Sequence, residues 1–278
     1  MIAIAEAAPS ATAPGNQVRS EEALVHSLQL TVSASRLSTF LSCRLKFFYR
    51  YICGLEKPKT PALHLGSSIH GVLKVWNKAR WKNQILTLKQ LHTVYGQIWS
   101  AEGEDPVEWE AGEEEQQKAV GWRLLETYFR ESIIPADEKP DAVEVPVETD
   151  LSQYGLPTLV GVLDLVQRGR IIDFKSSSQT PNPENVAHTT EIQTSSYAVL
   201  YREATGMREK GIELHHLVKL KNPKLVFTML PAMNEQQQTR LFRLMESYVE
   251  GLDRRDWVPS PGLQCSSCEF FNECRRWS

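Results

Sequence analysis

Two aspartates and a lysine are the residues of this chain best suited to chemistry. Asp164 lies in the apolar, β-branched segment Thr158–Val166, while Asp173 and Lys175 belong to a second apolar segment that begins at Ile171. Two carboxylates and an ammonium at the exit of a short sheet could hold a divalent cation and cut a phosphodiester.

The residues between the two segments predict how these side chains meet. Arg168-Gly169 is an X-Gly pair suited to a two-residue hairpin turn. Pairing counted outward from that turn places Asp164 opposite Asp173, with Cβ atoms roughly 5 Å apart. The two-residue period of a strand then places Lys175 on the same face as Asp173.

Two carboxylates this close would repel each other and destabilise an ordinary sheet, unless a cation compensates them. Hard oxygen ligands with no thiolate nearby favour Mg²⁺ or Mn²⁺ over zinc. The alternative is a surface hairpin whose polar residues face water, which is the usual origin of an isolated Asp-x-Lys. The apolar strands and the matched register argue against that alternative here.

Four short motifs follow one another along the chain. They are Leu65-Gly66-Ser67-Ser68-Ile69-His70, Gly161-Val162-Leu163-Asp164, Asp173-Phe174-Lys175 and Gln193-Thr194-Ser195-Ser196-Tyr197. Each motif alone is weak, but the four in this order are specific. The set resembles the RecB-like branch of the PD-(D/E)XK nucleases, and the resemblance covers nearly all of residues 31–278.

The resemblance implies a role for each matching residue. His70, Asp164 and Asp173 would bind the metal together with the backbone carbonyl of Phe174. Lys175 would orient or help to deprotonate the attacking water and would stabilise charge that builds on the phosphorus.

Three further positions are weaker candidates. Gln193 and Tyr197 lie one helical turn apart and share a face that could reach the lysine or DNA, although an ordinary amphipathic helix has the same spacing. His70 alone could equally be an interior or surface histidine. Glu144, in Val-Glu-Val-Pro, lies on an expected preceding strand where the family often has a carboxylate. Glu148 competes with it, and either could face solvent.

The cysteines form a second pattern. Cys265, Cys268 and Cys274 are clustered, whereas Cys43 lies 222 positions before Cys265. Without a secretory signal the expected compartment is reducing, so clustered thiolates are expected to bind metal and not to form disulfides. Four soft ligands suit structural zinc or an iron–sulfur cluster, and unliganded thiols remain an alternative.

The one-plus-three arrangement of these cysteines resembles the iron–sulfur staple of RecB-like nucleases, which implies a [4Fe–4S] cluster, with zinc as the alternative. Such a staple would tie the C-terminal segment to the first helix and would be structural. Cys53 is expected to be a small buried residue, although it is the one competitor of Cys43.

Length and composition fit one compact enzyme. The 278 residues, 41% of them hydrophobic, suffice for one sizeable domain or two small ones. Residues 1–30 are expected to be a flexible leader, and residues 31–278 a nuclease domain with a mainly helical part (31–135), a catalytic core (140–232) and a C-terminal helix with the cysteines (233–278). Neither a secretory signal nor a membrane-spanning run is recognised, so a cytoplasmic location and no membrane partner are expected.

Charge gives no global sign of nucleic-acid binding. The formal net charge is −3, but a local basic stripe and a metal can supply the attraction to phosphate. Basic residues surround the aromatic run at positions 47–51, and this combination suits single-stranded nucleic acid. They are Arg44, Lys46, Arg50, Lys57 and Lys59. The alternative is that the aromatic rings lie in the core and the basic side chains extend outward from it.

The order of expected elements indicates an α/β fold. Helices are expected over 35–51, 67–81, 88–100, 113–132, 191–205 and 235–252. Strands are expected over 142–148, 159–166, 171–175, 211–220 and 225–230, and the acidic segment 102–112 is expected to be a loop. This order predicts a mixed central sheet flanked by helices, which agrees with the restriction-endonuclease-like fold that the resemblance implies, with an N-terminal helical elaboration and an iron–sulfur staple.

The resulting expectation is a Mg²⁺- or Mn²⁺-dependent deoxyribonuclease. It would be an exonuclease that acts on single-stranded DNA ends in repair or recombination and leaves a 5′-phosphate, with a helicase as a candidate partner. One alternative is the trimming of DNA for CRISPR adaptation beside an integrase. Another is a catalytically silent iron–sulfur DNA-binding scaffold subunit, against which the complete His-Asp-Asp-Lys set argues. Polarity, strand preference, RNA tolerance and oligomeric state stay open.

Overall fold

A computed structural model describes residues 21–102 and 106–277. The expected leader over residues 1–30 is wrong in its last third, because Glu21–Leu30 forms helix α1 and buries Val25 and Leu28. The remainder of the expected leader lies outside the described residues.

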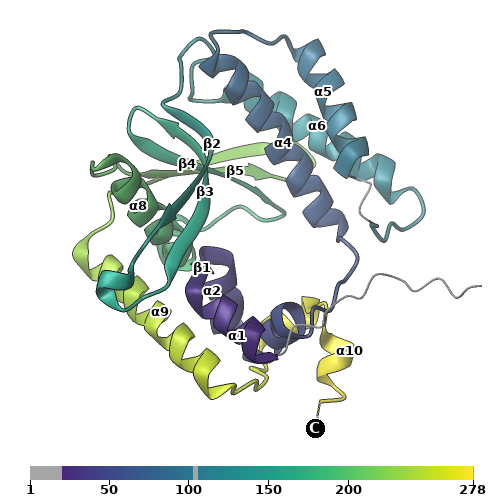
Figure 1. Ribbon diagram of the computed structural model, residues 1–278. Coiled ribbons are helices and arrows are strands. Elements are labelled where there is room, and N and C mark those ends of the chain that lie inside the picture. The colour runs from purple at the N-terminus through teal and green to yellow at the C-terminus, as the bar shows by residue number, and fades with distance from the viewer. Residues whose placement is uncertain (1–20, 103–105, 278) are drawn as a thin grey trace, which may run out of the picture.

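The described residues form one six-stranded mixed sheet with β3 near its middle (Figure 1). β3 pairs with β1 in parallel and with β2 and β4 antiparallel, β4 pairs with β5 in parallel, and β5 pairs with β6 antiparallel. The strands are β1 Thr31–Ser33, β2 Ala142–Thr149, β3 Thr158–Gln167, β4 Arg170–Ser177, β5 Ile212–Val218 and β6 Lys224–Leu230. The predicted mixed α/β architecture is therefore confirmed.

Helices cover both faces of this sheet (Figure 1). One layer contains α4 Pro61–Trp81, α5 Leu88–Glu102 and α6 Glu113–Glu131. The other layer contains α1, α2 Ala34–Ser42, α8 Glu191–Thr205 and α9 Glu235–Arg254. Shorter helices are α3 Arg44–Phe47, α7 Pro183–Thr189 and α10 Phe271–Cys274, with a π-helical turn at Phe48–Ile52 and 3₁₀ turns at Ser152–Tyr154 and Leu263–Ser267.

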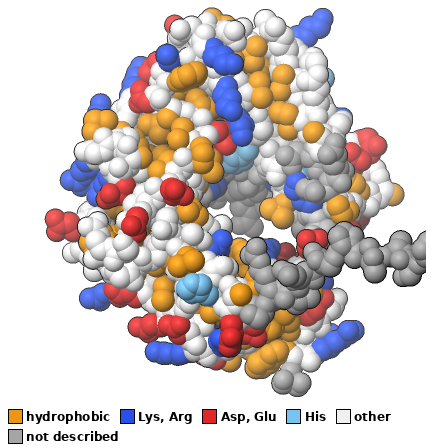
Figure 2. Space-filling view, viewed as in Figure 1, with side chains coloured by type: hydrophobic (Ala, Val, Ile, Leu, Met, Phe, Trp, Pro, Cys, Tyr) orange, Lys and Arg blue, Asp and Glu red, His pale blue; other side chains and the backbone are white. Residues whose placement is uncertain are grey.

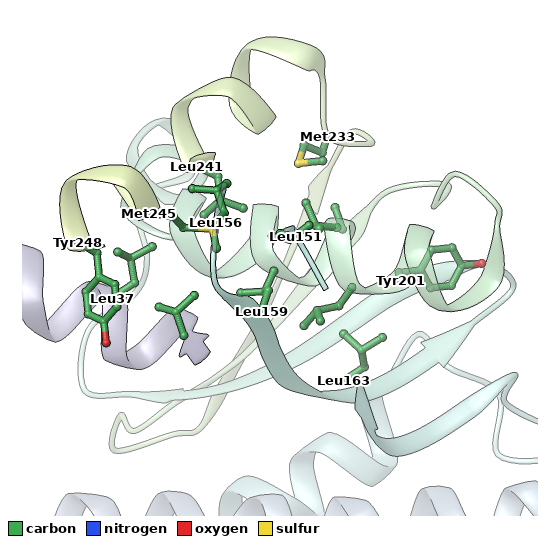
Figure 3. Packing of buried hydrophobic residues seen from close by; sticks show 14 of the residues in the cluster. Leu37, Leu151, Leu156, Leu159, Leu163, Tyr201, Met233, Leu241, Met245 and Tyr248 are labelled. Carbon is green, nitrogen blue, oxygen red and sulfur yellow. The ribbon is translucent and has the colours of Figure 1, made fainter. Parts of the chain in front are cut away.

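Each helical layer shares a hydrophobic core with the sheet. In the α8–α9 layer, Leu37 of α2, Tyr201 of α8 and Met245 of α9 pack over Leu159 and Leu163 of β3 (Figure 3). In the α4–α6 layer, residues of α4 and α6 pack over Leu165 and Phe174 on the opposite face. Among the described residues, no helix combines the length and the hydropathy that are needed to cross a membrane.

Several helix boundaries differ from the sequence expectation. The helix expected over 35–51 is broken at Cys43, whose φ of −163° is extended, so α2 ends before it and α3 begins after it. The helix expected from residue 67 begins earlier, because the Thr60 side chain accepts a hydrogen bond from the Leu63 N–H and Pro61 occupies the first turn. Strand β1 and helix α7 were not predicted.

The hairpin between β3 and β4 forms as predicted. Arg168 and Gly169 have φ of 53° and 73°, the left-handed pair of a type I′ turn. The register pairs Gln167 with Arg170 and Leu165 with Ile172. The ladder ends at the pair of Leu165 with Ile172, so the predicted pairing of Asp164 with Asp173 does not form, and Asp164 is the first unpaired residue.

Beyond that point the sheet forks. β2 follows one side of β3 from residue 159 to residue 166, so β1 and β4 must share its other side. β1 pairs with residues 158–160 and β4 with residues 165–167, so residues 161–164 have no paired strand on this side among the described residues. Asp164 lies in the opening of the fork, where its side chain can be reached from the neighbouring layers.

Candidate active site

The fork brings His70, Asp164 and β4 together. Asp164 Oδ2 accepts a hydrogen bond of 3.2 Å from the Phe174 N–H, so the side chain replaces a backbone partner where the ladder has ended. His70, near the middle of α4, places its Nδ1 3.4 Å from the same oxygen. A residue of the helical layer thus contacts the carboxylate in the fork.

Asp173 and Lys175 lie beside this contact on β4. Lys175 Nζ is 2.7 Å from Asp173 Oδ2, and the Asp173 side chain is only 2% exposed. Lys175 also donates a hydrogen bond of 2.7 Å to Gln193 Oε1, and Gln193 Nε2 is 3.2 Å from Asp173 Oδ1. The amide of Gln193 therefore contacts both members of the ion pair.

Helix α8 supplies the last two of the expected residues. Gln193 Nε2 donates a hydrogen bond of 2.7 Å to the Tyr197 hydroxyl one turn later. Burial raises the pKa of Tyr197, and the charges of Asp173 and Asp164 raise it further. The phenol therefore stays protonated and can act as a hydrogen-bond donor near the two carboxylates.

The two carboxylates lie close enough for the charge of Asp173 to affect the ionisation of Asp164. Burial raises the pKa of Asp164 to about 6, and the charge of Asp173 adds to that rise, whereas His70 opposes it. Like charges in a poorly solvated site favour the neutral acid. A divalent cation bound between the two carboxylates would lower the pKa of Asp164 again, because its positive charge favours the ionised form.

Glu144 joins this group, whereas Glu148 does not. The pairs Val143–Leu165 and Val145–Leu163 place Glu144 of β2 level with Asp164, and its charge raises the pKa of Asp164. Glu144 has a φ of 51°, a left-handed conformation that costs a non-glycine residue about 1–2 kcal/mol. Glu148 is exposed and pairs with Val160, farther along β3.

The side chains of β3 change the face of the sheet to which they point at this row of residues. Leu163 packs in the α8–α9 core, but Leu165 packs in the α4–α6 core, although a regular strand would direct both to one face. The strained backbone of Glu144 lies beside this change on β2. The local distortion lets carboxylates of β2, β3 and β4 approach one another from a single stretch of the sheet.

The donors fit a hard divalent cation in kind. They comprise carboxylate oxygens and one imidazole, and Asp173 Oδ2 is buried without a hydrogen bond from any described residue, although Lys175 is close to it. Within the described part of the chain, no three His, Cys, Asp or Glu side chains already form the ligand set of one ion. His70 contacts Asp164, and Lys175 contacts Asp173, in this part of the site.

His216 is a neighbour of the site that the sequence analysis missed. It is paired in register with Lys175 on the adjacent parallel strand β5, is 7% exposed, and has no partner for Nε2 among the described residues. Burial lowers its pKa, and the Lys175 charge lowers it further. The alternation of β5 places it on the Lys175 face, but only the pairing of β4 with β5 reveals that neighbourhood.

The four expected cysteines line one cavity of about 310 Å³. Cys43 lies at the break between α2 and α3. Cys265 lies in the 3₁₀ turn Leu263–Ser267, Cys268 directly follows that turn, and Cys274 ends α10. The backbone N–H of Lys46 points at Cys43 Sγ over 3.5 Å, and that of Gly262 at Cys265 Sγ over 3.4 Å. Cys53 is exposed, so the expectation of a buried residue is wrong, and it is not among the residues that line the cavity.

Thiolates in this cavity would repel one another. Burial raises the pKa of Cys274, and the charges of Cys43, Cys265 and Cys268 raise it further. Backbone N–H groups that point at sulfur are a common means of stabilising metal-bound thiolates. The chemistry of this donor set therefore fits a thiophilic metal centre.

The basic residues around the aromatic run hold the C-terminal segment. Arg44 binds Asp256 over 2.8 Å, Arg50 binds Glu269 over 2.6 Å, and Lys57 binds Glu273 over 2.6 Å. Lys46 also reaches Glu269, over 3.2 Å. Phe47 is fully buried. These contacts favour the packing alternative over a nucleic-acid surface for this part of the chain.

Comparison with known families finds a match over most of the chain. A family model for the PD-(D/E)XK nuclease superfamily matches residues 31–275. A search of curated proteins finds no match. Among solved structures, one described as a "putative exonuclease" from Eubacterium rectale aligns with a TM-score of 0.62 and 14% identity, over 97% of this chain and 94% of that chain. At this identity the likeness concerns the fold.

Proposed function

The chain belongs to the PD-(D/E)XK nuclease superfamily, and on that premise we propose that it is a metal-dependent deoxyribonuclease that removes nucleotides from single-stranded DNA ends. The observation that carries the proposal is the contact of Lys175 with Asp173, on a strand that runs beside Asp164 in the fork. The structural neighbour described as an exonuclease supports action at ends.

The site residues divide into those that hold a cation and those that act on water. His70, Asp164, Asp173 and the backbone carbonyl of Phe174 would hold Mg²⁺ or Mn²⁺. When bound, the ion supplies positive charge to the phosphate and lowers the pKa of bound water. Asp164 must be ionised to serve as a ligand, so its raised pKa ties cation binding to pH.

Lys175 would orient the attacking water and stabilise negative charge as it builds on the phosphate oxygens. The water oxygen forms a bond to phosphorus and gives up a proton to solvent, the bond from phosphorus to the 3′ oxygen breaks, and that oxygen takes a proton from solvent, so the products are a 5′-phosphate and a 3′-hydroxyl. Gln193 holds Lys175 in position through its 2.7 Å hydrogen bond, and the protonated Tyr197 keeps the Gln193 amide in place.

The cysteine cavity is proposed to hold a [4Fe–4S] cluster through Cys43, Cys265, Cys268 and Cys274. The four cysteines line one cavity of about 310 Å³, which supports one centre that they share, and four thiolates are the usual ligands of a [4Fe–4S] cluster. The centre lies apart from the catalytic residues and would tie the C-terminal segment to α3.

The test of the nuclease proposal is digestion of end-labelled single- and double-stranded DNA with Mg²⁺, with Mn²⁺ or with EDTA. Wild-type protein and Lys175→Ala would be purified anaerobically and compared at equal metal loading of the cysteine site. We expect metal-dependent shortening of the single strand that the variant loses. Equal digestion by both proteins would show that the activity does not come from this site.

A further inference from the structure

One exposed side of α4 carries a row of residues that begins in the active site. His70, Lys74 and Lys78 are four residues apart, so they lie on one side of the helix and rise about 6 Å from one to the next. The Lys74 side chain is 42% exposed and Lys78 is exposed. The other sides of α4 pack against α5, α6 and the sheet.

The row is continuous with the catalytic residues. His70 contacts Asp164 at one end, and Lys74 Nζ lies 3.4 Å from Glu144 Oε2, level with Asp164 on the neighbouring strand. Lys78, one turn farther, has no ion-pair partner within the described part of the chain. Figure 2 shows Lys and Arg side chains following one another over the region of α4, toward a histidine.

The far end of the row offers an aromatic face and more positive charge. Trp81 is 47% exposed, and Lys139 Nζ lies 5.1 Å from the centroid of its ring. Positive charge that follows a backbone, combined with an aromatic ring on which a base can stack, is the usual arrangement for binding a single strand without reading its sequence. The formal net charge of the chain is −3, so this positive row is a local feature.

We infer that this side of α4 is the path of the substrate strand next to the active site. Lys74 and Lys78 would contact two consecutive phosphates, and Trp81 would stack on a base near the C-terminal end of the helix. The inference rests on the proposed nuclease function and adds where the uncut part of the strand lies on the protein. A simpler role for Lys78, favourable charge at a helix C-terminus, predicts no contribution to DNA binding.

Binding of a fluorescent single-stranded oligonucleotide, measured without divalent cations over a series of salt concentrations, tests this path. For single strands the slope of log affinity against log salt concentration changes by about 0.7 for each phosphate contact. We expect Lys78→Glu to weaken binding and to reduce the slope by at least that amount. Lys89→Glu, at an exposed position of α5 in the same helical layer, is the matched control and should bind as wild type does.

Melting curves of both lysine variants exclude a folding defect as the cause. Trp81→Ala gives a second test of the path, because loss of the stacking ring should weaken oligonucleotide binding without changing the salt slope. Wild-type affinity and slope in Lys78→Glu, with metal-dependent cutting intact in the native protein, would overturn the path and leave the nuclease proposal standing. Loss of metal-dependent DNA cutting in the native protein itself would instead overturn the proposed function.

Discussion

The Lys175 ammonium lies 2.7 Å from Asp173 Oδ2, inside a site where that carboxylate is 2% exposed. A buried ion pair is costly to break from one side, because the remaining charge stays in a poorly solvated place. The Lys175 charge, or a metal ion in its place, offsets the cost of burying the Asp173 carboxylate. The same contact therefore supports both the local fold and the proposed catalysis.

Lys175→Ala is expected to lower the rate constant for cutting by about 10²–10³-fold, the usual effect of removing one group that stabilises transition-state charge. Single-turnover digestion at saturating metal measures this loss. Lys224→Ala, at the exposed start of β6, removes the same type of side chain away from the site and is the control. A rate for Lys175→Ala within about threefold of wild type would contradict the role.

Gln193→Ala should act through Lys175 and not through the cation. Its amide bridges Lys175 and Asp173, so its loss leaves the ammonium less well placed, and a misplacement of about 1 Å can cost up to about 10²-fold in rate. We expect kcat to fall while KM and the metal concentration for half-maximal activity stay near wild type. A variant that changes KM alone would point to substrate binding instead.

Asp164→Asn should stabilise the metal-free protein while abolishing cutting. The folded pKa of Asp164 is about 6 against an ordinary 3.8, so ionising it opposes folding by about 3 kcal/mol. The folded wild type is therefore more stable when Asp164 is protonated. This extra stability is fully present below pH 4 and is lost as the pH rises through about 6. The Tm advantage of the variant should therefore be large at pH 7.5 and absent at pH 4.

Added Mg²⁺ provides the complementary measurement for Asp164. Because the cation binds the folded state through this carboxylate, it should raise the Tm of wild type at pH 7.5 and leave Asp164→Asn unchanged. An equal rise in both proteins would show that the ion binds elsewhere.

Glu144→Gly should relieve backbone strain. Glycine adopts the φ of 51° without penalty, so we expect a gain of about 1 kcal/mol in the free energy of unfolding. Glu144→Gln keeps the strained backbone and removes only the charge, which makes it the matched control. Chemical denaturation of the three proteins separates the two effects, and a loss of stability in the glycine variant would contradict the strain.

Anaerobically purified protein should contain iron and acid-labile sulfide in equal amounts. Cys268→Ser should lose both, with a lower Tm, whereas Cys53→Ser should keep them, because Cys53 does not line the cavity. Elemental analysis decides the identity of the metal. One zinc ion per chain without sulfide would replace the cluster by the zinc alternative.

The sequence predicts the hairpin well because its information is local. Arg168-Gly169 determines the turn type, and the turn determines the register of the first three pairs. Asp164 lies one residue beyond these pairs and reaches β4 through its side chain. Gln193 and Tyr197 are equally local, since one helical turn joins them. These parts of the site need no knowledge of the rest of the fold.

The remaining features depend on contacts that no short segment reveals. β1 has three residues, too few for a periodic pattern, and it exists because β3 offers it a free edge. The fork, the change of face between Leu163 and Leu165, and the left-handed Glu144 all follow from how the strands meet. The pairing of Arg50 with Glu269 likewise becomes visible only when the two segments are placed together.

The contacts between the first helices and the C-terminal segment affect the order of events during synthesis. Arg50 and Glu269 are 219 positions apart, and Tyr49 donates a hydrogen bond to a carbonyl 224 positions later. The β3–β4 hairpin can form soon after it leaves the ribosome, but the cavity of Cys43 cannot close until Cys265, 222 positions later, has been made. The proposed metal centre could therefore assemble only after the β3–β4 hairpin and the sheet around it have been synthesised.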